Sequence, residues 1–170
     1  MVLDTAAVQS KAHLYPSKKT RVTAFIIDET QIQIGSTEAW WLWVAVEPLR
    51  RRILGIYISR HRNMLVVELF LRSLIKLYGR HIVYSDGGTW YPEACNSLRL
   101  KHRLHSTFEK SVIERAMEYI KDRTENFDDY YPCIKKEDCN LSHVYQWMVL
   151  FLFMHNTVTK SHIKFSKIKR

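Results

Sequence analysis

The chain contains few of the residues that mark secreted or membrane proteins. Its three cysteines, Cys95, Cys133 and Cys139, are too few and of odd number for a disulfide-stapled fold, so we expect a reducing, cytoplasmic setting. Cys133 and Cys139 with His143 match no common zinc spacing and lack a fourth ligand. The longest apolar run, residues 144–154, is far shorter than the roughly 18 residues that span a bilayer. With no signal core at the start of the chain, we expect no membrane partner.

Acidic residues are also in the minority. The chain has 17 Asp and Glu against 26 Lys and Arg, which gives a formal charge of +9 and a pI near 9.5. This balance favours a polyanionic partner such as nucleic acid, although it does not say which polyanion. Apolar residues make up 46% of the 170 positions, enough for the core of one domain. We expect a flexible arm at residues 1–20, one domain at residues 21–158 and a basic tail at residues 159–170.

Apolar and β-branched runs bounded by turn residues predict the order of strands and helices. The expected elements are strands at residues 22–28, 39–47 and 52–59, a helix between its cap Asn63 and Gly79, a strand at 81–86, a short helix near 90–98, a strand at 101–105, a helix capped by Ser111 and a last helix at 142–156. The expected apolar stripe of the first helix consists of Leu65, Leu69, Leu74 and Ile75. This order indicates an α/β fold in which a mixed five-stranded sheet carries helices on both faces.

Two acids occupy equivalent places in this order. Asp28 and Asp86 each end a short apolar strand, and a right-handed crossover would place the two strands side by side, about 5 Å apart. With a third carboxylate from a helix crossing that edge, they would supply hard oxygen ligands for two Mg²⁺ or Mn²⁺ ions about 3.5 to 4 Å apart. Asp at a strand end also commonly forms a turn, and Glu114 would by default be a solvated helix residue. Two acids in this topological order favour the metal site.

Several segments together carry a resemblance to a known family. They are FIIDET at residues 25–30, the Trp-rich strand at 39–47, YSDGGTWY at 84–91, IER at 113–115, KDR at 121–123 and the closing stretch at 147–156. The chain resembles, over about residues 22–162, the catalytic core of insertion-sequence DDE transposases, most closely the insertion-sequence-six type of bacteria and archaea. In that family a Lys or Arg follows the last acid by seven residues, as Lys121 follows Glu114.

The resemblance implies a ribonuclease H-like fold and a metal-dependent polynucleotidyl transferase. Asp28, Asp86 and Glu114 would be the catalytic ligands of two Mg²⁺ or Mn²⁺ ions. The family nicks DNA at element ends and joins the exposed 3′ hydroxyl to target DNA, which implies at least a homodimer and a cytoplasmic, nucleoid-associated protein. The expected DNA contacts are Lys121, Arg123, Arg115, Trp90 and Tyr91, of which the two aromatic residues are stacking candidates because they follow Asp86 directly.

The chain departs from the family pattern in two respects. Only 27 residues separate Asp86 from Glu114, fewer than is usual, so Glu109 and Glu118 compete for the third position. Residues 1–20 cannot form the helix-turn-helix domain with which relatives recognise element ends. A catalytically inactive or truncated DNA-binding remnant is therefore the alternative function. A ribonuclease H-like nuclease acting on RNA–DNA hybrids is a further one, and a tyrosine recombinase would not need the paired acids.

Other polar and aromatic residues have simpler interpretations. His102 and His105 lie between the second and third acids, but we expect surface or sheet-edge residues there and no catalytic role. The three tryptophans at positions 40, 41 and 43 should pack in the core, with Trp41 facing opposite to the other two. Residues 50–52 and 160–170 are basic and are candidates for phosphate contacts that weaken steeply with salt.

Overall fold

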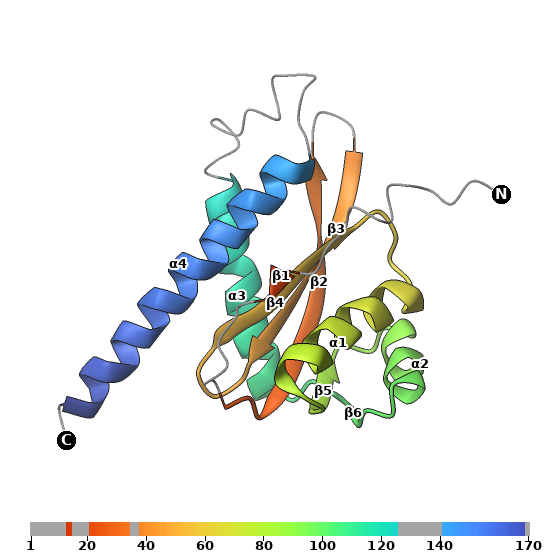
Figure 1. The fold of residues 1–170 in the computed structure, drawn as a ribbon, viewed down its shortest axis with the longest axis horizontal. Helices are drawn as coiled ribbons and strands as arrows, with labels where there is room; N and C mark the ends of the chain where they lie inside the picture. Colours follow the sequence, from red (N-terminus) through yellow and green to blue (C-terminus); the bar gives the residue numbers. More distant parts are fainter. Residues whose placement is uncertain (1–12, 15–20, 35–37, 126–140, 169–170) are drawn as a thin grey trace.

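The strands and helices of the domain follow the expected order. The computed structural model describes residues 13–14, 21–34, 38–125 and 141–168; the side chains at 13–14, 33–34, 38, 123–125, 143 and 159–168 lie outside that description. The elements are β1 (His13–Leu14), β2 (Ala24–Ile34), β3 (Glu38–Glu47), β4 (Arg52–Ser59), α1 (Met64–Tyr78), β5 (Ile82–Ser85), α2 (Trp90–Ser97), β6 (His102–Leu104), α3 (Thr107–Glu125) and α4 (Leu141–Ile168) (Figure 1).

One mixed sheet runs through the middle of the domain in the order β1-β4-β3-β2-β5-β6. Strands β2, β3 and β4 form an antiparallel meander, whereas β5 pairs parallel to β2 and β6 parallel to β5. The five expected strands are therefore present, and the two-residue β1 adds an edge beside β4. The predicted α/β architecture, a mixed sheet between helices, is confirmed.

Strand β2 is longer than the sequence predicted. It continues past Asp28 to Ile34 because β3 pairs with it as far as Ile34 and Glu38. On its other side, the pairing with β5 stops at Ile26 and Tyr84. Asp28 therefore lies beyond the paired part of the two parallel strands, although it is not at the end of its own strand.

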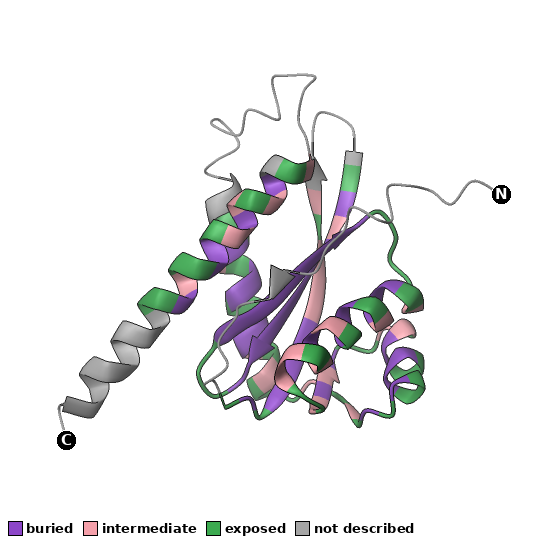
Figure 2. Cartoon of the chain, in the orientation of Figure 1, coloured by how far each residue is buried: buried purple, intermediate pink, exposed green. Residues whose placement is uncertain are grey.

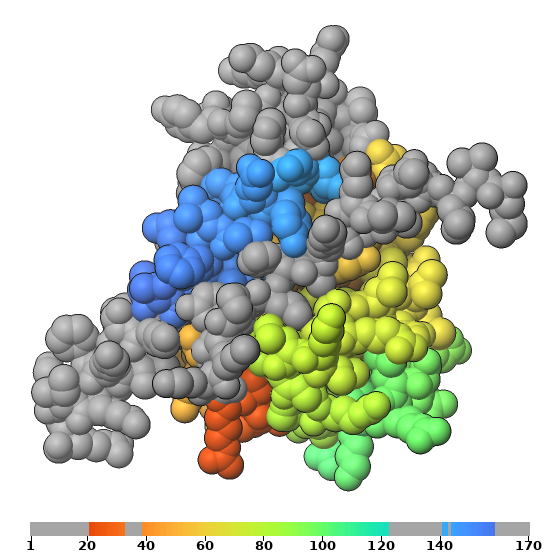
Figure 3. All heavy atoms as spheres, in the orientation of Figure 1, coloured from red at the N-terminus to blue at the C-terminus, as the bar shows by residue number. Residues whose placement is uncertain are grey.

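Two layers of helices cover the two faces of the sheet (Figure 1). Helices α3 and α4 pack on one face with Ile26, Val44 and Ile56. Helices α1 and α2 pack on the other with Phe25 and Ile27. The strands between the layers are mostly buried, and the outward sides of the helices are exposed (Figure 2). In the space-filling view α4 in blue and α1 in yellow-green occupy separate regions (Figure 3).

Helix α1 begins and ends where the sequence predicted, but its buried stripe differs. The Asn63 side chain accepts a hydrogen bond from the Val66 amide at 3.1 Å, and Gly79 ends the helix with a φ of 86° that favours glycine. Leu65 and Leu69 are 62% and 44% exposed, so they were wrongly placed in the core. The buried positions, spaced three and four residues apart, are Val66, Val67, Phe70, Leu71 and Leu74.

The last two helices begin earlier or end later than expected. Helix α3 starts at Thr107, before Ser111, because Ser106 caps it: the Phe108 amide donates to the Ser106 hydroxyl, and the Ser106 amide donates to Glu109 at 3.0 Å. Helix α4 continues beyond residue 156 to Ile168, so the backbone of the expected tail is helical as far as that residue. No helix in the described ranges is long and apolar enough to cross a membrane.

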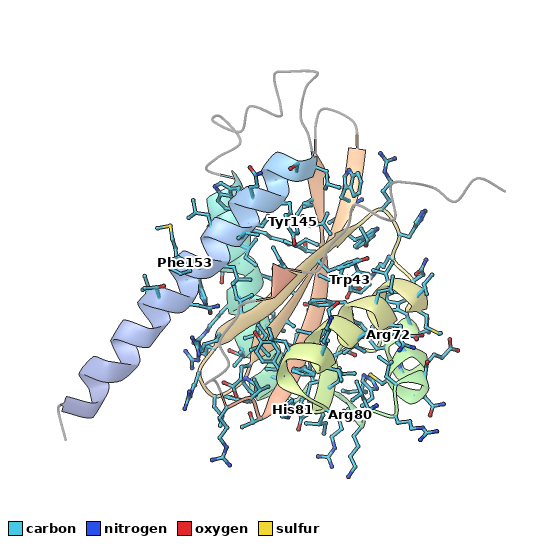
Figure 4. The ribbon with its side chains drawn as sticks, viewed as in Figure 1. Trp43, Arg72, Arg80, His81, Tyr145 and Phe153 are labelled. Carbon is cyan, nitrogen blue, oxygen red and sulfur yellow. The ribbon has the colours of Figure 1, made fainter. Side chains whose placement is uncertain are left out.

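A buried amide fixes α4 to the edge of the meander. The Asn156 side chain accepts from the Ile53 amide at 3.0 Å and donates to the Ile53 carbonyl at 2.8 Å. These two bonds satisfy both backbone polar groups of Ile53, and Asn156 is fully buried. On the outer side of the same helix Phe153 is exposed (Figure 4).

Candidate active site

Asp28 and Asp86 are brought to the same edge of the sheet by β2 and β5. The Asp28 carboxylate accepts a hydrogen bond from the Glu29 amide at 2.9 Å. The pKa of Asp28 is raised from 3.8 to about 6, chiefly by burial; the hydrogen bond from the Glu29 amide lowers it, and the negative charges of Glu29 and Asp86 raise it. Asp86 is exposed and lies close enough for its charge to act on Asp28. The two acids therefore form an electrostatically coupled pair.

The turn that carries Asp86 is tightly built. The Gly88 amide donates to the Asp86 carboxylate at 3.0 Å, as in turns that Asp commonly forms. A Cβ atom at Gly88 would lie 2.8 Å from the nearest carbon of the Trp90 ring, so this position requires glycine because of close approach. Asp86 thus acts as a turn former in this structure as well as a neighbour of Asp28.

The third acid is not gathered with the other two. Glu114 lies on the exposed side of α3, where its side chain is 59% exposed and forms an ion pair with Lys110 at 3.8 Å. Glu109 caps the start of α3, and Glu118 is exposed. Within the described part of the chain, no three His, Cys, Asp or Glu side chains are arranged as a metal site. Cys133 and Cys139 lie outside the described residues, as does the His143 side chain.

The expected DNA contacts differ in their accessibility. Arg115 and Lys121 are exposed on α3, whereas the Arg123 side chain lies outside the described structure. Trp90 is half-buried with the Arg62 guanidinium over its ring at 4.4 Å. Tyr91 is completely buried, so its ring is not open to a base in this structure.

Some expectations about the other basic and aromatic residues were wrong. Arg52 is 4% exposed, so of the Arg triplet only Arg50 and Arg51 are surface residues. Trp40 packs toward α3 and α4, whereas Trp41 and Trp43 pack toward α1 and α2. Because side chains alternate along a strand, positions 41 and 43 share a face, and it is position 40 that faces the other way. Trp43 lies between the sheet and these helices (Figure 4).

The two histidines near the site contact protein groups. His102 is 2.8 Å from the Ser85 hydroxyl and its ring stacks on Tyr91 with an interplanar angle of 7°. The His105 ring is half-buried, and its Nε2 has no hydrogen-bond partner among the described residues. Burial lowers the pKa of both histidines, which keeps them neutral. His102 therefore has structural partners on two sides, Ser85 and Tyr91.

Sequence reasoning missed a buried ionic cluster beside the pair of acids. The Glu29 side chain is 0% exposed and forms an ion pair with Arg62 at 2.6 Å. The Tyr91 hydroxyl donates to the other Glu29 oxygen. The Arg62 guanidinium lies between the rings of Trp41 and Trp90, at 4.7 and 4.4 Å. Strand alternation was the signal that could have found it, since it puts Glu29 on the same buried face as Phe25 and Ile27.

Sequence comparisons find an archaeal relative of this chain. No protein family model matches the chain. An uncharacterized protein of Methanocaldococcus jannaschii is 30% identical over 144 residues, which are 84% of this chain and 64% of that protein, so the chain spans less than two thirds of this relative.

Several solved structures with the same fold come from retroviruses. The HTLV-2 integrase catalytic core domain in complex with magnesium, in its dimeric form, superposes with a TM-score of 0.56 and 17% identity over 76% of this chain and 83% of that one. The trimeric form of the same domain superposes with a TM-score of 0.55 and 18% identity over 75% of this chain and 82% of that one. A chain of the simian T-cell lymphotropic virus intasome superposes with a TM-score of 0.55 and 16% identity, over 76% of this chain and 49% of that one. The chain therefore has the ribonuclease H-like fold of retroviral integrase catalytic cores.

Proposed function

We propose that this chain is the catalytic domain of a DDE-type DNA transposase of the insertion-sequence-six type. The observation that carries the proposal is the coupled pair of Asp28 and Asp86, presented by adjacent parallel strands at one edge of an integrase-like sheet. A half-buried carboxyl with a pKa of about 6 beside a second acid is costly for folding. Such arrangements are found at functional sites because the cost is recovered on binding a ligand.

Asp28 and Asp86 supply two of the carboxylates that a divalent metal site needs. Asp28 and Asp86 offer hard oxygen donors, and a bound cation would remove the electrostatic cost of placing these charges together. Two Mg²⁺ or Mn²⁺ ions there would activate the attacking oxygen and stabilise the leaving oxygen at phosphorus. Glu114 is the proposed third ligand; because it is exposed and paired with Lys110 here, it joins the pair only if the first turns of α3 rearrange. The magnesium complexes of the HTLV-2 core accord with this choice of metal.

DNA is the proposed partner, both as element end and as target. The charge of +9 supports a polyanionic substrate, and Arg115, Lys121 and Arg123 on α3 are the proposed phosphate contacts. Trp90 is the proposed stacking residue, whereas Tyr91 would first have to leave the core. Joining two ends requires at least a dimer, so we propose a homodimer that works on DNA in the cytoplasm, at the nucleoid.

The test is DNA cleavage and strand transfer in Mn²⁺, on a supercoiled plasmid and on duplexes from the DNA that flanks the gene. Asp28→Asn and Asp86→Asn should abolish both reactions without unfolding the protein. Glu114→Gln should do the same, whereas Glu109→Gln and Glu118→Gln, which remove competing acids from the same helix, should retain activity. Activity surviving in either Asp variant would overturn the proposal, and loss of activity only in Glu109→Gln would move the third ligand to that residue.

A second candidate function is a catalytically inactive DNA-binding remnant. The exposure of Glu114 favours it, because a decayed site would no longer hold the third acid inward. This candidate predicts salt-dependent DNA binding without nicking of any substrate in Mn²⁺. Preferential cutting of an RNA–DNA hybrid would instead indicate a ribonuclease H-like nuclease.

A further inference from the structure

The carboxylate of Glu29 joins three separate segments around the pair of acids. Glu29 follows Asp28 in β2, so its side chain leaves the sheet on the opposite face, where it is fully buried. A buried carboxylate is stable only with partners that replace water. Its partners come from other segments: Arg62 from the connection between β4 and α1, and Tyr91 from the first turn of α2.

Tyr91 links Glu29 to both sides of Asp86. On one side, its ring stacks on His102, which contacts the hydroxyl of Ser85, the residue before Asp86. On the other side, Tyr91 belongs to the helix that begins directly after the glycine turn. Burial, and then the charge of Glu29, raise the pKa of Tyr91, so the phenol stays protonated and donates. The turn is therefore held before and after Asp86.

Arg62 closes the same network from outside. Its guanidinium is held between Trp41 and Trp90, so it pairs with Glu29 in a fixed orientation. The Trp90 ring in turn lies against Gly88, which donates to Asp86. Arg62 therefore contacts Glu29 directly and reaches the turn that carries Asp86 through Trp90.

We propose that Glu29, Tyr91 and Arg62 form a positioning network that holds the Asp86 turn against the middle of β2, and so sets the place of Asp86 relative to Asp28. The inference rests on the proposed function for its effect on metal binding, because only a metal site needs the two carboxylates at a set separation. None of the three residues is proposed to contact metal or DNA. Such residues orient the side chains that bind a metal, and their removal commonly lowers metal affinity.

The experiment compares two variants that each lose one tyrosine hydroxyl. Tyr91→Phe removes the hydrogen bond to Glu29, whereas Tyr78→Phe removes a hydrogen bond to the Leu54 carbonyl at 3.0 Å, elsewhere in the domain. Mn²⁺ binding is measured by electron paramagnetic resonance of the free ion, and amide exchange at Gly88 by mass spectrometry or NMR. We expect Tyr91→Phe to weaken Mn²⁺ binding about tenfold and to speed exchange at Gly88, and Tyr78→Phe to do neither.

The outcomes separate this inference from the proposed function. If wild type binds Mn²⁺, the inference requires Tyr91→Phe both to weaken Mn²⁺ binding and to speed amide exchange at Gly88. If either quantity is unchanged in this variant, the inference is overturned. If wild type binds no Mn²⁺, the proposed function fails, and exchange at Gly88 alone decides whether the network holds the turn. Arg62→Lys, at a side chain that is 36% exposed, keeps the charge but cannot stack as a plane between two rings. It should show the same two changes and replaces Tyr91→Phe if that variant does not fold.

Discussion

Replacing the Asp28 carboxylate by an amide should make the metal-free protein more stable. Burial and neighbouring negative charge raise the pKa of Asp28 from 3.8 to about 6. Each pH unit between these two values is worth about 1.4 kcal/mol. The ionised side chain therefore lowers the free energy of unfolding by about 3 kcal/mol at neutral pH. Asn has nearly the same shape and carries no charge, so Asp28→Asn removes this cost.

The pH dependence has a definite sign. Below pH 3.8 the carboxyl is protonated in both the folded and the unfolded chain, so the two proteins should be equally stable. Between pH 3.8 and about 6 only the unfolded chain loses the proton, so wild type loses stability relative to Asp28→Asn as the pH rises. Above about pH 6 both states are ionised and the full difference remains.

Thermal unfolding by circular dichroism in EDTA measures this difference. For a chain of this length, about 3 kcal/mol corresponds to a rise in Tm of roughly 6 to 12 °C at pH 7.5. At pH 4 the two proteins should differ by less than about 1 kcal/mol. Glu118→Gln, at an exposed position of α3, is the control and should stay within about 0.5 kcal/mol of wild type. No gain at pH 7.5, or an equal gain at pH 4, would refute the reasoning.

Three further substitutions test the contacts that hold the site and its scaffold. Gly88→Ala places a methyl group 2.8 Å from the Trp90 ring and should destabilise the protein by about 1 to 3 kcal/mol, seen as a lower Tm and altered tryptophan fluorescence; an unchanged Tm would show that the ring moves freely. Asn156→Ala leaves the amide and carbonyl of Ile53 buried without partners and should cost about 2 to 5 kcal/mol in urea unfolding, whereas a cost under about 1 kcal/mol would mean that α4 is not fixed there. Asn63→Ala removes the cap of α1 and should cost about 1 kcal/mol in the same assay, a value that Asn63→Asp should largely restore.

The fold was predictable because local signals and the order of elements agree. Apolar runs placed the strands, while Asn63 and Gly79 marked both ends of α1. Three antiparallel strands followed by crossover helices leave few possible topologies, and the observed sheet is one of them. Asp28 and Asp86 could be placed at one edge for the same reason, since parallel neighbours present equivalent positions together.

The finer parts of the site depend on partners distant in sequence. Strand β2 runs beyond Asp28 because β3 continues to pair with it, which no local property of residues 29–34 shows. The burial of Glu29 depends on Arg62 and Tyr91, which approach it from 33 and 62 residues away. The start of α3 is ambiguous in the sequence, because Ser106 with Glu109 and Ser111 with Glu114 both have the spacing of a capping box; the helix begins at the first of them.

The contact between Asn156 and Ile53 has a consequence for the order in which the chain folds during synthesis. The two residues are 103 positions apart, so β4 leaves the ribosome long before the helix that completes its hydrogen bonds. At about 5 to 20 residues per second, that interval lasts on the order of 5 to 20 seconds. Throughout it, the part of the sheet face that α4 covers is an apolar surface without its helix, exposed to other nascent chains. The C-terminal helix is thus the step that ends the risk of aggregation for this domain, and truncation before residue 141 should yield insoluble protein whether or not the acids at the other edge are intact.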